Sequence, residues 1–485
     1  MRRKRTIYFN DARHYYLFVF EPPMRIEDAW VAIDEVAGTA VDTFSYGVSR
    51  GDGLFYPSNV GMRFGADIQP FDIVPYWRVW ENMQSLIDRG LDPLQVLIDR
   101  AHDKGLDFFA SLRMGGFDGF EGDYEVAKGG RGYAHEEARE YQFSIIEELA
   151  TRYPIEGVEL DFAAAPSGNG FYLREEDVQE YAPVITDFVR RAAAAVRQRP
   201  GTAGEVGARV YPTLEMNRKV GLEVDVWLEE GLVDYVVPML YSCFILDADM
   251  PIDWIVEAAH AKDISVYSML QPYYREQAEP HFDRPHPTPQ MMRAAAANAW
   301  DRGVDGLYTW FMSWPLGDGE RSTLTELGDA ELVREKDKHY FLRWRKEDDK
   351  EFDYPAYLPL EISAPDAQKR YEIPFAIADD TQNPRLRNLR LRLGIVNLVM
   401  ADKLEILLNG ESLSSEICKR TYLRSMDPYT GQWLEFDLER LRPQKGRNML
   451  EICLKERPPR MGGSITVKDV EIVVTYDTYP VGRTD

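Results

Sequence analysis

The chain has 485 residues, 45% of them hydrophobic, which is enough for a large core and for two or more domains. Its 81 acidic and 57 basic residues give a net charge of −24, which disfavours nucleic acid, phosphorylated polymers and anionic membranes as partners. The three cysteines, Cys243, Cys418 and Cys453, have no CxxC spacing, so neither a disulfide framework nor a zinc site is indicated.

The N-terminal segment 1–5 is basic, but no apolar run of signal-peptide type follows it. No stretch of the sequence is apolar over the length of a membrane span. We therefore expect a cytoplasmic protein, or a secreted one if a leader has been removed from the chain.

Short apolar runs alternate with amphipathic helical patterns over the first 340 residues. The strands are predicted at 15–20, 41–47, 106–113, 157–162, 206–214, 233–240, 264–270 and 305–312, and the clearest helices at 92–104, 135–152, 175–198, 252–262 and 288–302. Eight alternations predict the α/β class and a (β/α)₈ TIM barrel. A doubly wound open sheet is the alternative, but no GxGxxG motif follows an early strand.

The pattern changes near residue 345. A charged stretch at 346–358 is typical of a linker, and period-2 apolar runs follow, such as 370–377, 389–395, 432–437 and 465–475. We therefore predict a catalytic barrel over 1–345 and an accessory, jelly-roll-like β-sandwich over 359–485.

The most informative segment is Gly157–Phe162, a predicted buried strand that carries two carboxylates. Residues two apart on a strand point the same way, so Glu159 and Asp161 share one face at a separation of about 6.6 Å along the strand. Burying two acids side by side is costly unless they are paired or hydrogen-bonded. The segment therefore points to chemistry rather than to stability alone.

Other polar and aromatic residues lie at or just after the predicted strand ends, where TIM barrels carry their active sites. Glu215 follows the fifth strand, and the others are Tyr46, Arg113, Tyr241, Gln271, Trp310 and Trp314. Carboxylates, arginine, amide and aromatic rings together make a sugar-binding set, because polar groups bind hydroxyls and rings stack on the C–H faces of sugars. Tyr76, Trp77 and Trp80 are either additional sugar platforms or the apolar face of a helix.

The segment 156–162 (EGVELDF) resembles the DGxxLDF strand of family-10-like glycosyl hydrolase barrels, a diffuse group of bacterial proteins. The likeness extends to Tyr8–Pro23, Asp92–Met114 and Asp305–Met312, and so covers roughly the first 340 residues. It implies a barrel that acts on carbohydrate. More distantly, the segment is similar to the DxxDxDxE strand of chitinase-type hydrolases, but Ala163 stands where the acidic glutamate would be.

These observations predict a glycoside hydrolase that cleaves an oligo- or polysaccharide with two carboxylates. We expect Asp161 to be the nucleophile or base, Glu215 to be the general acid, and Glu159 to tune Asp161 or to react itself. Arg113, Tyr46, Tyr241, Gln271, Trp310 and Trp314 are expected to bind the substrate. Ala163 favours the alternative, a carbohydrate-binding pseudoenzyme with a degenerate site.

We expect no cofactor and no metal. A metal-dependent hydrolase or isomerase would need ligands at several strand ends, and none of the predicted strand ends carries a histidine. His281, Asp283 and His286 have an imaginable ligand spacing, but they lie in a proline-rich stretch that favours an ordinary loop. A homo-oligomer is compatible with the sequence.

Overall fold

A computed structural model describes residues 2–477, except 12–15, 51–52, 116–119, 121, 126–130, 164–172, 200, 202, 241–243, 276–284, 311, 346–353, 415–417 and 422–428. The described chain divides into two compact units. The first contains 1–244, 251–272 and 303–328, and the second contains 245–250, 273–302 and 329–485.

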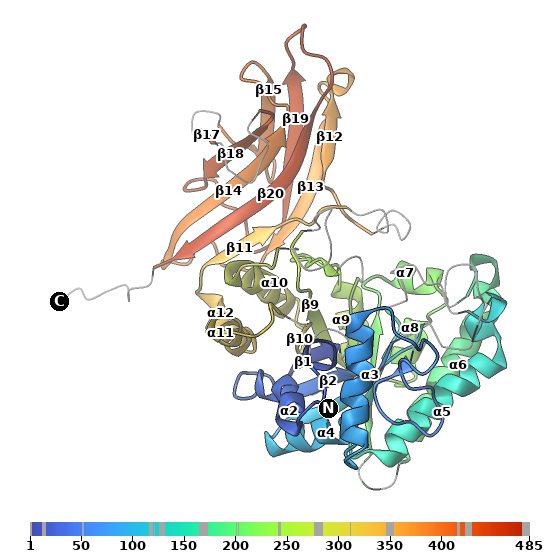
Figure 1. Ribbon diagram of the computed structural model, residues 1–485. Helices are drawn as coiled ribbons and strands as arrows, with labels where there is room; N and C mark the ends of the chain where they lie inside the picture. Colours follow the sequence, from blue (N-terminus) through green and yellow to red (C-terminus); the bar gives the residue numbers. More distant parts are fainter. Residues whose placement is uncertain are drawn as a thin grey trace. The chain divides into compact units, whose positions relative to one another are not determined.

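The first unit contains a closed barrel of eight parallel strands, in the spatial order β1-β10-β9-β8-β7-β6-β5-β2 (Figure 1). The strands are β1 (Arg5–Asp11), β2 (Thr43–Gly47), β5 (Asp107–Arg113), β6 (Gly157–Asp161), β7 (Glu205–Val210), β8 (Tyr235–Pro238), β9 (Ser265–Leu270) and β10 (Gly306–Thr309). A short hairpin, β3 (Ser49–Arg50) and β4 (Gly53–Leu54), follows β2. The predicted TIM barrel is confirmed.

The helices of the first unit follow the strands along the chain. They are α1 (Tyr16–Val19), α2 (Ile26–Asp34), α3 (Val74–Ile87), α4 (Pro93–Asp103), α5 (Glu136–Arg152), α6 (Val178–Arg197), α7 (Leu214–Lys219), α8 (Val224–Glu229), α9 (Asp253–His260) and α11 (Asp318–Leu327). The start of α4 shows why the sequence signals worked: Pro93 is its first residue, and the Asp92 side chain accepts a hydrogen bond from the amide of Leu94 at 2.9 Å.

One strand prediction was wrong. Segment 15–20 is not a barrel strand; its residues 16–19 form α1, and the first strand is β1, at Arg5–Asp11. Both segments are aromatic and apolar, so composition does not separate them. The strand that pairs with both β10 and β2 is the one that closes the barrel.

Glycines make room for large side chains inside the barrel. A Cβ atom on Gly207 would lie 1.9 Å from Cζ of Tyr235, and one on Gly157 would lie 2.4 Å from Cε1 of Phe109. Tyr235, Tyr267 and Tyr308 therefore fill an interior that branched aliphatic residues fill in most TIM barrels. Their hydroxyl groups bring hydrogen-bonding capacity into the barrel core.

The second unit contains two antiparallel sheets that pack over a common core, so the predicted β-sandwich is also confirmed (Figure 1). One sheet has the order β11-β20-β14-β18-β17, with β12 pairing to β20, and the other has the order β13-β19-β15-β16. The strands are β11 (Lys338–Phe341), β12 (Leu360–Ser363), β13 (Arg370–Ile377), β14 (Leu386–Val396), β15 (Lys403–Leu408), β16 (Glu411–Ser412), β17 (Cys418–Thr421), β18 (Gly431–Asp437), β19 (Gly446–Glu456) and β20 (Ser464–Tyr476).

The second unit also includes helices from before residue 345, namely α10 (Pro289–Asp301) and α12 (Ala330–Arg334). Ala294 of α10 belongs to the core cluster of the sandwich, and Asn298 donates a hydrogen bond to the carbonyl of Ala376 in β13 at 3.0 Å. The compact units therefore do not follow the expected boundary at 345. Most of the expected linker, 346–353, lies outside the described residues.

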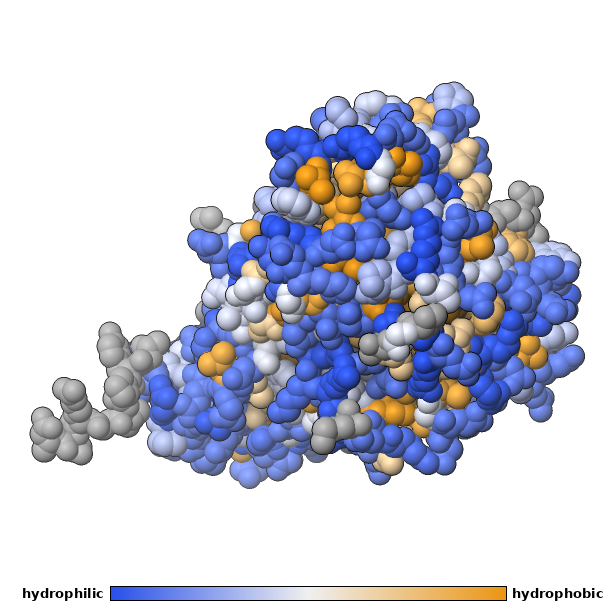
Figure 2. All heavy atoms as spheres, turned by 90° about the horizontal axis from the view of Figure 1, so that it is seen from below, coloured by the Kyte–Doolittle hydropathy of each residue, from blue (hydrophilic) through white to orange (hydrophobic). Residues whose placement is uncertain are grey.

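The surface agrees with the acidic composition. Figure 2 shows a face on which hydrophilic residues predominate and hydrophobic ones form separate small groups. Within the described residues, no helix combines the length and apolar character needed to cross a membrane.

Candidate active site

Glu159 lies on β6 inside the barrel and is fully buried. Its carboxylate accepts hydrogen bonds from Ser111 at 2.7 Å, Tyr308 at 2.8 Å and Tyr235 at 3.1 Å, so three other strands hold it. Burial raises the pKa of Glu159, against the opposing effect of Arg209. This environment supports the expected positioning role better than a direct role in bond cleavage.

Asp161 lies two residues further along β6, at the C-terminal end of the strand. In the sheet register it stands between Arg113 on β5 and Arg209 on β7. Nη2 of Arg209 lies 2.5 Å from Oδ2 of Asp161, and both side chains are fully buried. Nε of the same arginine lies 3.2 Å from Oε1 of Glu159.

A second ion pair lies on the same side of the barrel. Asp11, the last residue of β1, is buried, and its Oδ2 accepts a hydrogen bond from Nη2 of Arg113 at 2.6 Å. We call the C-terminal end of the barrel interior, where Asp11, Arg113, Asp161 and Arg209 lie, the barrel mouth.

The electrostatics of the mouth keep Arg209 charged. Burial alone would lower its pKa, but Asp161, Tyr308 and Glu159 outweigh that effect and raise the pKa above its ordinary value. A cation fixed at 2.5 Å favours the ionised form of the Asp161 carboxylate. Asp161 is thus suited to act as a nucleophile or base and not as a proton donor.

Aromatic rings surround the same arginine. Cζ of Arg209 lies 4.1 Å from the ring centroid of Phe9 and 5.0 Å from that of Trp310. Trp310 itself is buried and packs edge-on against Phe9 at 4.9 Å and Phe244 at 4.8 Å. Because Arg209 extends from β7 to residues of β1 and β10, its guanidinium forms the floor of the mouth.

Some hydrogen-bonding capacity at this level is unused. Gln271, just after β9, donates from Nε2 to the carbonyl of Leu240 at 3.0 Å. Its buried Oε1 has no hydrogen-bond partner among the described residues, and neither does the buried Nη1 of Arg209. Buried polar atoms without partners carry a free-energy cost, which a polar ligand would offset.

Glu215 is exposed and lies in the first turn of α7, not at a strand end. The preceding strand, β7, ends at Val210, earlier than predicted. Asn217 fixes the helix to that strand, because its side chain donates to the carbonyls of Tyr211 and Thr213 at 2.8 Å each and accepts from the amide of Tyr211 at 2.9 Å. Glu215 thus follows β7, the neighbour of β6, and lies beyond the C-terminal end of that strand.

Two of the expected substrate-binding residues lie away from the mouth. Tyr46 is on the outward face of β2, where it is fully buried and its hydroxyl lies 2.7 Å from that of Tyr16. The sequence places Tyr46 near the end of the strand but does not determine which face of the strand its side chain occupies. Trp314 is partly buried and donates a hydrogen bond to Glu35. Tyr241 lies outside the described residues.

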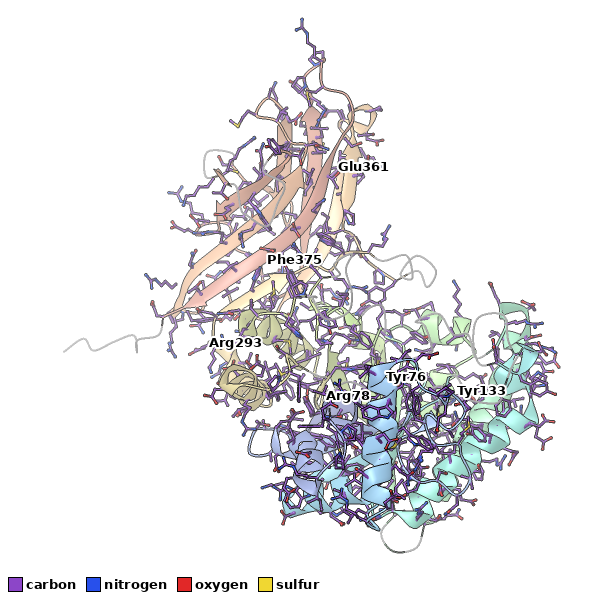
Figure 3. All side chains as sticks on the ribbon, viewed as in Figure 1. Tyr76, Arg78, Tyr133, Arg293, Glu361 and Phe375 are labelled. Atoms are coloured by element: carbon purple, nitrogen blue, oxygen red, sulfur yellow. The ribbon has the colours of Figure 1, made fainter. Side chains whose placement is uncertain are left out.

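The aromatic cluster at 76–80 is part of α3, from which Tyr76 and Arg78 project (Figure 3). The Tyr76 ring packs edge-on against Phe64 at 5.2 Å, and the guanidinium of Arg63 covers the ring of Trp80 at 3.7 Å. For Tyr76 and Trp80 the structure favours a packed helix face over a sugar platform, whereas Trp77 is 40% exposed.

Sequence reasoning missed Asp11 and Arg209. Asp11 was missed because the first strand was placed at 15–20 instead of Arg5–Asp11. Arg209 could have been found in the sequence, because it is the only charged residue in the otherwise apolar run 206–210. It lies two residues after Gly207 and therefore on the same face of the strand. A charged residue inside a buried barrel strand requires a partner of opposite charge, and Asp161 on the neighbouring strand provides it.

Within the described residues, no group of three or more His, Cys, Asp or Glu side chains is arranged to hold a metal ion. His281 and Asp283 lie outside that part of the chain, and His286 lies 5.1 Å from Tyr273 between ring centroids.

Comparisons with known proteins leave the family open. No family model matches the chain, and no curated protein matches it. Among solved structures, alpha-L-fucosidase isoenzyme 2 from Paenibacillus thiaminolyticus matches with 11% identity and a TM-score of 0.43, over 68% of this chain and 48% of that one. This chain thus spans about half the length of that enzyme.

Two other solved structures show the same level of likeness. A GH29 alpha-L-fucosidase from Bacteroides thetaiotaomicron matches with 10% identity and a TM-score of 0.37, over 96% of this chain and 92% of that one. A GH138 enzyme targeting pectin rhamnogalacturonan II matches with 12% identity and a TM-score of 0.38, over 67% and 38% of the two chains. At these values the likeness carries no inference about the activity of this chain.

Proposed function

We propose that this protein is a glycoside hydrolase that cleaves an oligo- or polysaccharide at the barrel mouth. The observation that carries the proposal is the row Arg113–Asp161–Arg209 in the sheet register, which pairs a carboxyl group with a guanidinium at the C-terminal end of β6. Active sites of TIM barrels lie at this end of the strands. The resemblance of the strand to those of family-10-like glycosyl hydrolases is independent support from the sequence.

In this proposal Asp161 is the nucleophile or the base that activates water, and Glu215 is the general acid. Cleavage of a glycosidic bond needs one carboxylate that stays ionised and one carboxylic acid that gives up a proton. The pairing of Asp161 with Arg209 suits the first role. Glu215 is exposed, so its carboxyl is accessible to a substrate bound at the end of β7.

Other residues at the mouth and at the neighbouring strand ends bind and orient the sugar. Nη1 of Arg209 provides a hydrogen-bond donor and Oε1 of Gln271 an acceptor, and neither atom has a hydrogen-bond partner among the described residues. The Asp11–Arg113 pair adds a second carboxylate and guanidinium, which together recognise neighbouring hydroxyl groups. Trp310 contributes an aromatic ring.

A second candidate function is carbohydrate binding without hydrolysis. It is favoured by the complete burial of Glu159 and Asp161 and by their ion pairs with Arg209, which are also what a purely structural network would show. Ala163, in place of an acid after β6, points in the same direction.

The test is a screen of the full chain for hydrolysis of aryl glycosides and neutral polysaccharides, with Asp161→Asn and Glu215→Gln as variants. The proposal predicts hydrolysis by the wild type and a large loss in both variants. Saturable binding without any hydrolysis would support the second candidate. Hydrolysis that persists at the wild-type rate in both variants would place the chemistry elsewhere.

A further inference from the structure

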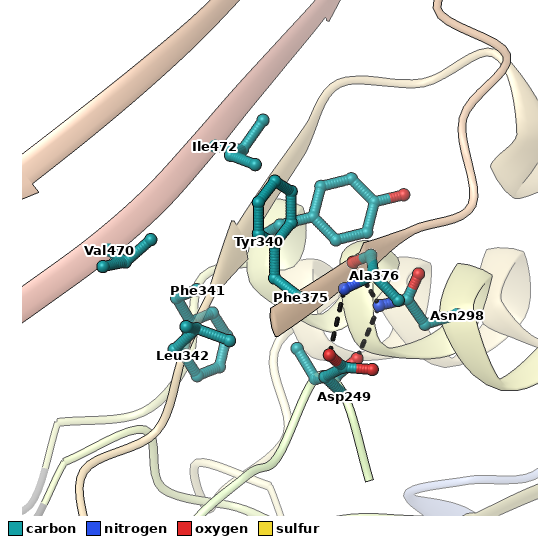
Figure 4. Close-up of a pocket in the computed structure, with 10 residues that line it drawn as sticks. Asp249, Asn298, Tyr340, Phe341, Leu342, Phe375, Ala376, Val470 and Ile472 are labelled. Atoms are coloured by element: carbon teal, nitrogen blue, oxygen red, sulfur yellow. Dashed lines mark hydrogen bonds between the residues drawn. The ribbon is translucent and has the colours of Figure 1, made fainter. Parts of the chain in front are cut away.

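The second unit has a small cavity with a mostly apolar lining (Figure 4). Asp249 accepts a hydrogen bond from the amide of Ala376 at 3.0 Å, and Asn298 donates to the carbonyls of Ala248 at 2.7 Å and Ala376 at 3.0 Å. Because these polar groups bind one another, the cavity offers a ligand no polar recognition. The first unit contains a polar cluster of a different kind, on segments that leave the barrel mouth.

In this cluster one carboxylate binds two arginines and a histidine. Asp123 lies in the short helix η1 (Gly122–Tyr124), and its carboxylate oxygens lie 2.7 Å from Nη2 of Arg131 and 2.5 Å from Nη2 of Arg174. Nε2 of His135 lies 3.0 Å from Oδ2 of the same carboxylate. Hydrogen bonds from Arg131 and His135 lower the pKa of Asp123 to about 2, so the carboxylate is ionised at neutral pH. We call these four residues the Asp123 cluster.

The Asp123 cluster joins the segments that follow two neighbouring barrel strands. Asp123 and Arg131 lie between β5 and α5, whereas Arg174 lies between β6 and α6. β5 ends in Arg113 and β6 ends in Asp161, both of which belong to the barrel mouth. In TIM barrels the segments after the strand ends build the active site. A single carboxylate therefore ties together two segments that begin at the mouth.

Tyr133 connects the Asp123 cluster to the strand ends (Figure 3). It lies between Arg131 and His135 in the sequence and is fully buried. Its hydroxyl donates to the carbonyl of Met114, the residue after β5, at 3.0 Å. The amide of Met114 in turn donates to the carbonyl of Asp161 at 3.0 Å. Two hydrogen bonds thus lead from Tyr133 to the last residue of β6.

Aromatic packing holds the same segment from two sides. The Tyr133 ring packs edge-on against Phe188 of α6 at 5.6 Å and lies 6.3 Å from Phe162, the residue after β6. The ring of Tyr124 stacks on His135 with 3.9 Å between their centroids. Close-packed side chains transmit a displacement to their neighbours. A shift of segment 131–135 would therefore reach the ends of both strands.

We propose that Asp123 is a positioning residue for the barrel mouth. By holding together the segments after β5 and β6, it fixes the strand ends that carry Arg113 and Asp161. It acts through Tyr133 and Met114 and touches no reacting group. Its effect on turnover rests on the proposed function, whereas its effect on the order of the mouth does not.

The role differs from a contribution to global stability. The Asp123 side chain is 33% exposed, and ion pairs in contact with solvent contribute little to the free energy of unfolding. Asp123→Asn, which keeps the shape of the side chain and removes its charge, should therefore change the melting temperature only slightly. Its effect should be concentrated at the mouth.

Hydrogen exchange of the full chain, followed by mass spectrometry, tests the inference without a substrate. In Asp123→Asn, peptides that contain the amides of Met114, Gly132 and Phe162 should exchange roughly tenfold faster or more, because the contacts that protect them open more often. Exchange in β1 and β9, on the other side of the barrel, should stay as in the wild type.

Turnover of a glycoside that the wild type hydrolyses is the second readout. Asp123→Asn should lower kcat by about tenfold to a hundredfold, because a small misplacement of a reacting group is costly, and should change KM less. Asp123→Glu restores a carboxylate and should recover part of kcat. A purely structural role would lower the melting temperature and leave kcat of the folded protein unchanged.

Glu140→Gln is the matched control. Glu140 of α5 pairs with Arg191 of α6, so this ion pair also joins the elements after β5 and β6, but it lies on the helices and not at the strand ends. The control should leave both exchange and kcat unchanged. Arg174→Gln, which removes the contact from the segment after β6 alone, should act like Asp123→Asn to a smaller extent, and it tests the inference if Asp123→Asn does not fold.

Unchanged exchange at the three amides in a folded Asp123→Asn, or an equal effect of Glu140→Gln, would overturn the inference. Its failure is distinct from failure of the proposed function. Faster exchange at the mouth in a chain that hydrolyses no glycoside would leave the inference standing and remove the hydrolase. Hydrolysis with the same exchange and kcat in wild type and Asp123→Asn would do the reverse.

Discussion

Asp161 and Arg209 form an ion pair that is fully buried in the barrel mouth. Glu159 and Asp11 add two further acids near the same arginine. A buried charge pair is costly to desolvate, and its value becomes apparent when one partner is removed, because the other charge is then left buried without compensation. The network therefore makes a direct prediction about stability.

Arg209→Met should destabilise the protein by about 3–5 kcal/mol, because Asp161 and Glu159 lose their shared cation. Urea unfolding measures this change in the free energy of unfolding. Arg218→Met is the control, because Arg218 pairs with Asp225 on the exposed surface, where solvent screens the pair, and its loss should cost far less than the loss of Arg209. Equal costs for the two variants would contradict the assigned role of Arg209.

Glu35 provides a prediction about pH. Burial raises its pKa to about 7, although hydrogen bonds from Tyr8 and Trp314 oppose the rise. The unfolded chain releases this proton near the ordinary value of 4.5, and the folded chain near 7. The contribution of Glu35 to the free energy of unfolding is therefore fully present below pH 4.5 and is lost as the pH rises through about 7.

Glu35→Gln keeps a polar side chain at this position but removes the titration. Relative to the wild type, the variant should gain stability between pH 4.5 and pH 8, by roughly 3 kcal/mol at most. Chemical unfolding at several pH values checks this. A difference between variant and wild type that stays constant with pH would show that Glu35 titrates normally.

The sequence predicted that charged, polar and aromatic side chains gather at the strand ends, but it identified only some of the residues that do so. Asp161 and Arg113 end strands whose patterns are clear, and Gln271 and Trp310 directly follow such strands, so their positions could be predicted. Tyr46 also ends a strand, but one residue decides which face a side chain occupies, and the sequence alone did not settle the register.

At the level of elements, the apolar periodicity identified seven of the eight barrel strands, and β1 was the exception. The segment Tyr15–Phe20 has the stronger β-type composition, yet four of its residues form α1. The first strand of the barrel is determined by the pairing of β1 with β10, whose residues are about 300 positions apart in sequence. A local sequence pattern contains no information about such a distant pairing.

The junction between β7 and α7 is the element on which the proposed acid depends. Asn217→Ala would remove three hydrogen bonds that fix α7 to the end of β7. We expect a loss of about 1–3 kcal/mol in the free energy of unfolding and a lower turnover rate, because Glu215 loses its fixed position. Asn217→Asp keeps the acceptor and should lie between wild type and Asn217→Ala in both measurements. An unchanged turnover rate in Asn217→Ala would argue against Glu215.

At the scale of the whole molecule, the two compact units are interleaved along the chain. Helix α10 precedes β10 in sequence but belongs to the second unit, where Ala294 enters the sandwich core. β11 also ends before residue 345 and pairs with β20, near the end of the described chain. Neither connection could be predicted from composition shifts, which mark linkers but not the packing of individual helices.

A chain that ends at residue 345 should consequently be less stable than the full chain. It loses β13 and β20, the partners of α10 and β11, and so exposes apolar surface. Thermal unfolding and light scattering should show a lower melting temperature and association of the fragment. A monomeric fragment with the melting temperature of the full chain would show that the barrel sequence is self-sufficient.

The central claim is that the carboxylate of Asp161 takes part in glycosidic cleavage, and kcat of Asp161→Asn on a hydrolysed substrate tests it most directly. We predict a fall by several orders of magnitude, because an amide can neither attack the sugar nor activate water. Arg209 keeps Glu159 as a buried counter-charge in this variant, and a thermal unfolding curve verifies that the protein is folded at the assay temperature. Asp187→Asn, at an exposed carboxylate on α6, is the control and should keep full turnover. Near wild-type kcat in Asp161→Asn would contradict the account.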